Sequence, residues 1–187
     1  MKTTTETHFF AQLYLEDLRG HLLKAKDMAE KALAQVDDAT FFRTLDDETN
    51  SLAVQVKHIA GNLRSRFTDF LTTDGDKPDR QRDTEFLVEE DSRQSLMEAW
   101  ETAWSLQLTA VDGLHVSDLD RRITIRGEPH TVLKALQRNL GHLSYHTGQI
   151  VQLAKHFQGD RWQTLSIPRG ESEAYSAQVR AMFGASE

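Results

Sequence analysis

The segment PHTVLKALQRNLGHLSYHTGQIVQLAKHF, residues 129–157, decides the fold class. Its apolar residues mostly recur at the spacing of one face of an α-helix. They include Leu133, Leu136, Leu140, Leu143, Ile150 and Ala154. Pro129 is tolerated in a first helical turn, and Gly159 suits the position just after the last turn. The segment therefore predicts a long amphipathic helix that opens at Pro129 and ends at Gly159.

Three earlier segments have the same period. The first covers residues 6–36, and the second runs from Asn50, a good N-cap, to Phe70. The third follows Asp91, whose spacing to Gln94 suits a capping box, and reaches Ala110. Four helices, each with one apolar stripe, predict an all-α four-helix bundle.

The connections between these helices differ in length. A short acidic stretch joins the first two helices, whereas a polar segment of about twenty residues, 72–91, joins the second to the third. So long a link permits a crossover that leaves the second and third helices parallel, which gives an up-down-down-up topology. Polar and apolar residues alternate briefly within residues 121–127, which predicts a short extended piece. Residues 159–187 form a tail that we expect to pack on the bundle and to end in a short helix capped by Ser172.

Composition narrows the function classes. A length of 187 residues fits one domain, 1–187. The chain has no cysteine, which excludes disulfides, iron–sulfur clusters and a cysteine nucleophile and leaves His, Asp and Glu as metal ligands. A net charge of −7 without a basic block argues against nucleic-acid or membrane partners. The N-terminus lacks the pattern of a signal peptide, and no apolar run is long enough to span a bilayer. We therefore expect a soluble cytoplasmic protein.

Two histidines stand four residues apart on the last helix, His142 and His146, so one metal ion can reach both. On a helical wheel they lie about 130° and 90° from the apolar stripe, and His58 lies about 130° from the stripe of the second helix in the same sense. Side chains with equal offsets in the same sense meet in one groove only if these two helices are antiparallel, as the crossover predicts. The wheel thus indicates a three-histidine metal site with an open position, and the alternative is a solvated helix face.

Other candidates are less specific. Asn62 and Gln149 each lie one turn beyond a histidine, where their amides could orient a ligand. Trp162 is predicted to cover a bundle end or a pocket. Arg169 is a candidate to bind an anionic group of the substrate, and the alternative for an arginine between a proline and a glycine is a turn residue. The remaining histidines are predicted to be surface residues; they are His8, His21, His115, His130 and His156.

Known motifs of other enzyme classes are absent. The sequence has no HExxH, ExxH, GxxxxGK[ST], GxGxxG or GxSxG pattern, which argues against zincins, ferritin-like di-iron bundles, nucleotide-binding proteins and serine hydrolases. The combination of KHIAGN (57–62) with HLSYHTGQ (142–149) and SIPRGES (166–172) instead resembles the DinB/YfiT group of the DinB-like superfamily, in a branch of domains of unknown function.

The resemblance covers residues 45–172 and implies an up-down-down-up bundle, frequent homodimers and a divalent metal held by His58, His142 and His146. Three imidazole ligands with open positions suit Zn, Ni or Fe. Characterised members of the superfamily include transferases that use low-molecular-weight thiols. We therefore expect transfer of an exogenous thiol to a small electrophilic molecule. The alternatives are a metal-dependent hydrolase that uses metal-bound water and a non-catalytic, stress-associated dimeric bundle. Hydrolysis ranks second because the nearest acid on a histidine face, Asp69, lies about 16 Å from His58 along the helix.

Overall fold

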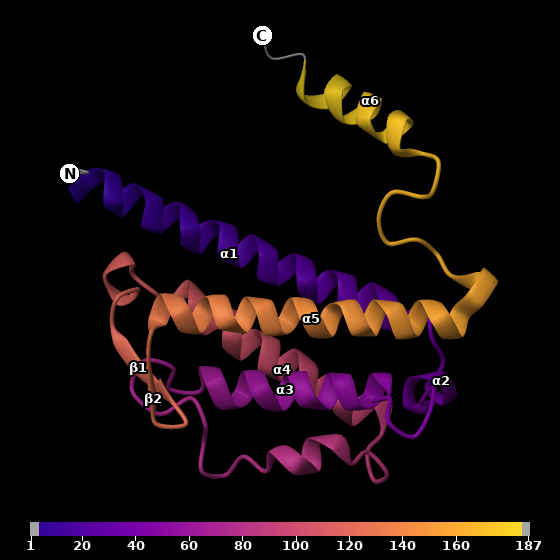
Figure 1. Ribbon diagram of the computed structural model, residues 1–187, viewed down its shortest axis with the longest axis horizontal. Coiled ribbons are helices and arrows are strands. Elements are labelled where there is room, and N and C mark those ends of the chain that lie inside the picture. The colour runs from indigo at the N-terminus through magenta and orange to yellow at the C-terminus, as the bar shows by residue number, and fades with distance from the viewer. Residues whose placement is uncertain (1–3, 185–187) are drawn as a thin grey trace.

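The computed structural model describes residues 4–184, and most of them are helical (Figure 1). The long helices are α1 (Thr4–Leu33), α3 (Leu52–Phe67), α4 (Arg93–Asp112) and α5 (Val132–Gln158). The short helices are α2 (Asp38–Phe42) and α6 (Ser172–Phe183), together with the 3-10 turns η1 (Arg82–Phe86), η2 (Val116–Asp118) and η3 (Gly159–Arg161). Two short strands, β1 (Arg122–Ile125) and β2 (Glu128–Thr131), complete the described part of the chain.

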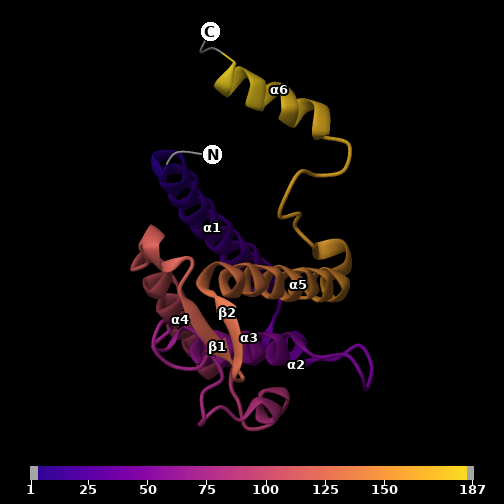
Figure 2. The same ribbon diagram turned by 60° about the vertical axis from the view of Figure 1, so that its left-hand side comes forward.

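The long helices enclose one apolar core. α3 packs against α4 and α5, and α1 packs against α5 and α4 (Figures 1 and 2). The largest fully buried side chains come from all four of these helices and from α2; they include Leu18, Leu22, Phe41, Leu63, Trp100, Trp104 and Leu143. Burial of this apolar surface is the main force that holds the helices together.

Side-chain contacts give the relative direction of neighbouring helices. Arg19, at the middle of α1, pairs with Asp112 at the end of α4, whereas Glu30, late in α1, accepts a hydrogen bond from Trp100. The helices α1 and α4 are therefore antiparallel. In α3 and α5 the pairs are Gln55 with His146 and His58 with His142, which makes these two helices antiparallel as well. The antiparallel arrangement required by the wheel argument is present.

The start of each long helix differs slightly from the sequence prediction. Ser51, not Asn50, caps α3 by accepting a hydrogen bond from the backbone N–H of Val54. Ser92, not Asp91, caps α4 and shares a capping box with Ser95. In each case a serine hydroxyl one residue further on has the geometry to reach the exposed N–H group.

The last long helix also starts later than predicted. Pro129 lies in β2, and Thr131 caps α5 by accepting a hydrogen bond from the backbone N–H of Lys134. The predicted extended piece continues across a two-residue turn at Arg126 and Gly127, with φ angles of 57° and 73°. This left-handed pair suits a tight hairpin, so β1 and β2 form a two-stranded antiparallel sheet rather than one isolated strand.

The first two helices end earlier than predicted. α1 stops at Leu33, and a new cap at Asp37 starts α2, so residues 34–36 form a turn. α3 stops at Phe67 because Thr68 caps a carbonyl of the last turn and Asp69 adopts a φ of 46°. Phe70 lies beyond this helix but still packs into the core.

His130 is the one predicted surface histidine that is buried. Its side chain is 3 % exposed, because residue 130 faces inward in β2 toward the core, near Glu128. Successive side chains of a strand point to opposite faces, and this alternation directs His130 inward. The sequence prediction missed the burial of His130 because it assigned Pro129 to a helix. His8, His21, His115 and His156 are exposed as predicted.

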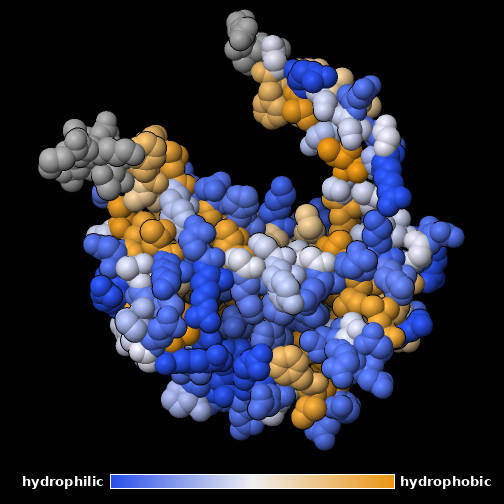
Figure 3. Space-filling model, in the orientation of Figure 1, coloured by the Kyte–Doolittle hydropathy of each residue, from blue (hydrophilic) through white to orange (hydrophobic). Residues whose placement is uncertain are grey.

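The C-terminal tail divides into two parts. Trp162 and Leu165 pack against the core, whereas α6 has no buried residue and stands away from the other helices (Figures 1 and 2). Only the first part of the tail therefore packs on the other helices, and α6 has Glu171, not Ser172, at its N-cap position. Apolar side chains gather on α6 and at the N-terminal end of α1 (Figure 3). No described helix is long and apolar enough to cross a membrane.

Candidate metal centre

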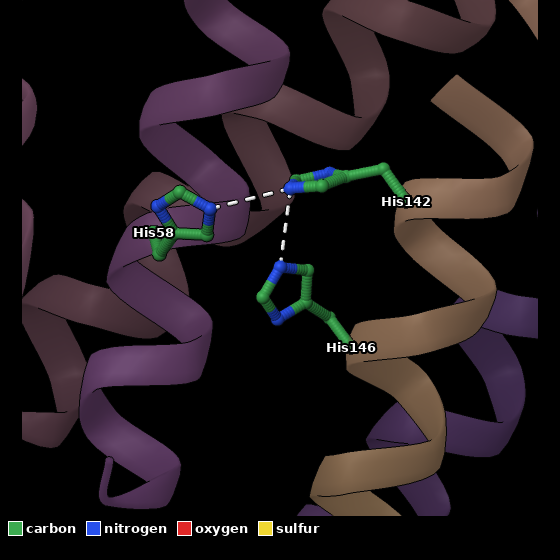
Figure 4. Close-up of side chains that lie close together, drawn as sticks. All are labelled: His58, His142 and His146. Atoms are coloured by element: carbon green, nitrogen blue, oxygen red, sulfur yellow. Dashed lines mark hydrogen bonds between the residues drawn. The ribbon is translucent and has the colours of Figure 1, made fainter. Parts of the chain in front are cut away.

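Three histidines from two helices meet at the groove between α3 and α5 (Figure 4). Nε2 of His142 lies 3.3 Å from Nε2 of His58 and 3.1 Å from Nε2 of His146. One ligand nitrogen from each ring lies within 4.8 Å of the others. His58 is buried and the other two rings are half-buried, because the apolar stripes of both helices face the core and leave the histidines at the edge of the groove.

Neighbouring acceptors fix the tautomers of two of these rings. Nδ1 of His58 lies 2.8 Å from Oε2 of Glu85, and Nδ1 of His146 lies 2.6 Å from Oε1 of Gln55. A carboxylate or amide oxygen accepts, so Nδ1 of each ring carries the proton and donates. The Nε2 atoms of His58 and His146 then present lone pairs toward Nε2 of His142, and such lone pairs repel one another unless a proton on His142 or a cation lies among them.

The spacing of the nitrogens fits a divalent transition metal. Two ligand nitrogens of a tetrahedral site with bonds of about 2.0–2.1 Å lie about 3.3–3.4 Å apart. The separations at His142, 3.1 and 3.3 Å, are close to that edge length. Three imidazoles without a carboxylate suit Zn, Ni or Fe, and they leave a coordination position for another ligand.

Protonation of His142 and His146 does not compete with metal binding at neutral pH. Burial, followed by repulsion from the charged forms of His146 and His58, lowers the pKa of His142 to about 3. Burial and then His58 lower the pKa of His146 to about 4, although a hydrogen bond with Gln149 acts in the opposite direction. Both rings are therefore neutral near pH 7, which is the form that binds a metal.

A buried ion pair holds the carboxylate behind His58. Arg80 donates to both oxygens of Glu85, over 2.8 and 2.9 Å, and its side chain is 4 % exposed. Burial raises the pKa of Glu85, but hydrogen bonds from His58 and Arg80 outweigh it, so the pKa lies below its ordinary value. A charged carboxylate on the outer nitrogen of a ligating histidine fixes the ring and makes it more basic.

Gly61 makes room for this carboxylate. A Cβ atom at Gly61 would overlap the side chain of Glu85. The glycine in the middle of α3 therefore permits a close approach of η1 to the helix, one turn from His58.

A cavity of about 200 Å³ adjoins the histidines. His58 and His142 form part of its wall, and the hairpin strand β1 and the end of α3 form another part. A small molecule in the cavity would therefore contact two of the three rings.

The structure brings some of the predicted residues to this region and leaves others away from it. Asn62 lines the cavity, and Gln149 reaches His146. Trp162 and Arg169 follow the end of α5, whose last residue is about 18 Å along the helix axis from His146. Arg169 is exposed, and neither residue lines the cavity.

Sequence reasoning missed three residues around the site, Gln55, Arg80 and Glu85. Gln55 could have been identified from the sequence, because it precedes His58 by three residues and shares its helix face. Arg80 and Glu85 lie in the long link, which has no period that predicts where a side chain points. Asp69, the acid identified from the sequence, lies past the end of α3 and is exposed.

The fold and the site define a mostly helical protein with a three-histidine cluster beside a small cavity. Residues 9–171 match the model of a family described as "protein of unknown function (DUF1572)", so the chain belongs to this family. Comparisons with curated proteins and with solved structures gave no match.

Proposed function

We propose that the protein is a metal-dependent transferase that joins a low-molecular-weight thiol to an electrophilic small molecule. The observation that carries this proposal is the convergence of three imidazole nitrogens beside a cavity, in a chain that has no cysteine. A divalent metal held by His58, His142 and His146 would bind the thiol and lower its pKa, so that the thiolate is available at neutral pH. The sulfur must then come from a separate thiol.

The residues of the chain have distinct parts in this reaction. Glu85 and Gln55 hold His58 and His146 with their Nε2 lone pairs directed into the cluster. The cavity wall excludes water and holds the electrophile beside the sulfur. The sulfur–carbon bond forms as the leaving group departs with its electron pair, and the thiol proton passes to solvent.

The arrangement of the helices supports the DinB-like fold. The helices α1 and α5 run parallel, because Tyr14 contacts Gln137 and Gln158 donates to the carbonyl of Gln35. Since α1 is antiparallel to α4 and α3 is antiparallel to α5, the helices α3 and α4 run in one direction. We infer an up-down-down-up four-helix bundle of the DinB-like superfamily, with residues 68–92 as the crossover.

Hydrolysis remains second among the candidate activities. Glu85 lies behind His58, and both of its oxygens are engaged by Arg80 and His58. No described Asp or Glu lines the cavity beside the cluster. A carboxylate in the right place to accept a proton from water is therefore not among the described lining residues.

The test loads the protein with Zn²⁺, Ni²⁺ or Fe²⁺ and follows the reaction of cellular thiols with monochlorobimane by fluorescence. Chloride leaves as the sulfur–carbon bond forms, so product is measured directly. We expect a metal-dependent rate above that of the His58→Ala protein. Equal rates for the two proteins with every metal and thiol would contradict the proposal.

Elemental analysis separates the catalytic proposal from the non-catalytic one. One equivalent of divalent metal per chain, lost in His58→Ala, supports a metal enzyme. A folded protein purified without metal that also fails to bind added Zn²⁺ in calorimetry would favour a dimeric bundle without a metal function.

A further inference from the structure

The cavity beside the histidines has a strongly positive wall. Five arginines line it, and no described Asp or Glu does; the arginines are Arg66, Arg80, Arg82, Arg126 and Arg138. Behind the wall, Asp76 and Glu85 pair with the first two arginines and with Arg126. Two carboxylates therefore oppose five guanidinium groups, apart from a long exposed contact between Arg82 and Asp83.

The five arginines differ in burial: Arg82, Arg126 and Arg138 are exposed, whereas Arg66 and Arg80 have largely buried side chains. Arg66 and Arg80 have side chains that are 11 % and 4 % exposed. Burial, together with the charges of Arg80 and Arg126, lowers the pKa of Arg66 from its ordinary value, against the effect of Asp76. Positive groups that are packed this closely in a concave wall attract an anion.

Three buried donors of the wall also lack an acceptor among the described residues. They are Nη1 of Arg80, Nδ2 of Asn139 and Nδ1 of His142. The side-chain oxygen of Asn139 already accepts from Gln107, which leaves its nitrogen available. Nδ1 of His142 is a donor when its Nε2 faces the cluster. Buried donors normally have partners, so three of them at one cavity point to a ligand rich in acceptors.

Apolar side chains form another part of the wall. Phe67, Phe70, Ile123 and Ile125 line the cavity, and the two isoleucines alternate with exposed residues along β1. A cavity of about 150 Å³ can hold benzene, so about 200 Å³ has room for one ring and a small polar group.

We propose that this cavity binds a small organic acid, with the carboxylate held by Arg80, Arg138 and Asn139 and a ring-sized apolar body against Phe67 and Ile125. The inference rests on the proposed thiol transfer and identifies its electrophilic substrate as an acid of this class. Arg80, Arg138 and Asn139 would supply the donors for the carboxylate, so the acid would be bound beside the metal site rather than by the metal.

The test measures binding of benzoate to the metal-free protein by isothermal titration calorimetry, with neutral benzamide as a matched probe of the same shape. We expect benzoate to bind at least tenfold more tightly. Arg138→Gln removes a cavity arginine that forms no ion pair within the described part of the chain, and we expect it to weaken benzoate binding by about tenfold. The matched control is Arg122→Gln, because Arg122 is exposed on β1, outside the cavity lining, and its loss changes the net charge equally.

Each arm has a result that overturns the proposal. Equal binding of benzoate and benzamide, or equal weakening by the two substitutions, would show that the cavity does not recognise the carboxylate. If benzoate binds only when Zn²⁺ is present, and Arg138→Gln leaves its affinity unchanged, the acid is bound by the metal instead. Inorganic phosphate that binds more tightly than benzoate would assign the site to phosphate. No thiol is present, so failure of the transferase assay leaves these results unaffected.

Discussion

Nδ1 of His58 lies 2.8 Å from Oε2 of Glu85, although the two residues are 27 positions apart in the sequence. The contact connects the long link between α3 and α4 to the histidine cluster. Arg80, from the same link, holds both oxygens of Glu85. The link thus has a part in the site beyond that of a crossover, since it sets the orientation and the basicity of one ring.

We predict that Glu85→Gln weakens metal binding. The amide can still accept from His58, but it lacks the charge that makes the imidazole a stronger ligand, and loss of such a partner costs about 10–100-fold in metal affinity. Competition with a chromophoric chelator gives the dissociation constant for Zn²⁺. The control is Glu89→Gln, an exposed acid of the same link. Equal affinities of the two variants would show that Glu85 does not support the metal site.

We predict a similar effect from Gly61→Ala, by a steric route. The new methyl group overlaps the Glu85 side chain, so the carboxylate must move away from His58. We expect weaker Zn²⁺ binding in the chelator assay, although alanine favours a helix over glycine by about 1 kcal/mol. Gly20→Ala is the matched control, because a Cβ there meets no atom within 4 Å. Gly20→Ala should raise the thermal midpoint and leave the affinity for Zn²⁺ unchanged. If Gly61→Ala gave both of these results, the predicted overlap with Glu85 would be wrong.

The sequence alone predicts the three histidines of the site, which lie on helices. The offsets of His58, His142 and His146 from their apolar stripes follow from helix geometry, and the structure brings the three rings together. What periodicity cannot predict is the path of residues 68–92. This segment contains Arg80 and Glu85, whose positions depend on long-range ion pairs rather than on any repeating pattern.

Periodicity also fails to predict the helix ends and the hairpin. Ser51 and Ser92 replaced the predicted caps because adjacent residues can all cap a helix, and packing selects one of them. Pro129 suited a first helical turn equally well, but the turn at Arg126 and Gly127 pairs residues 122–125 with 128–131 and makes Pro129 part of a strand.

We predict that Asp74 stabilises the hairpin in a pH-dependent way. Its oxygens accept from the backbone N–H groups of Arg126 and Gly127, over 2.8 and 2.9 Å. Burial raises the pKa of Asp74, but these and further hydrogen bonds lower it below the ordinary value of 3.8. The unfolded chain then binds the proton more readily, so this stabilisation is present above about pH 4 and is lost as the pH falls below that value.

Urea unfolding of Asp74→Asn tests this expectation. At pH 6 we expect the variant to be about 1 kcal/mol less stable than the natural protein, since the charged acceptor is lost. The difference should shrink at pH 3, where Asp74 begins to bind a proton in the unfolded chain. Asp120→Asn, at an exposed position after η2, serves as the control and should show no such change with pH. A difference that is the same at both pH values would contradict a charged Asp74 in the fold.

The charge of the cavity wall predicts a preference among electrophiles. A thiolate displaces chloride from a benzylic carbon, and 4-(chloromethyl)benzoate and 4-(chloromethyl)benzamide differ chiefly in charge. We expect kcat/KM for the acid to exceed that for the amide by about tenfold or more, because a guanidinium–carboxylate contact contributes about 1.5–3 kcal/mol. Arg138→Gln should reduce this ratio, whereas Arg122→Gln should leave it unchanged, after subtraction of the uncatalysed rate of each reagent. Because the ratio compares two electrophiles on one protein, a general loss of metal or of stability cancels from it, and only a change in recognition of the carboxylate can alter it. A ratio near one in the natural protein would mean that the arginines hold something other than the electrophile.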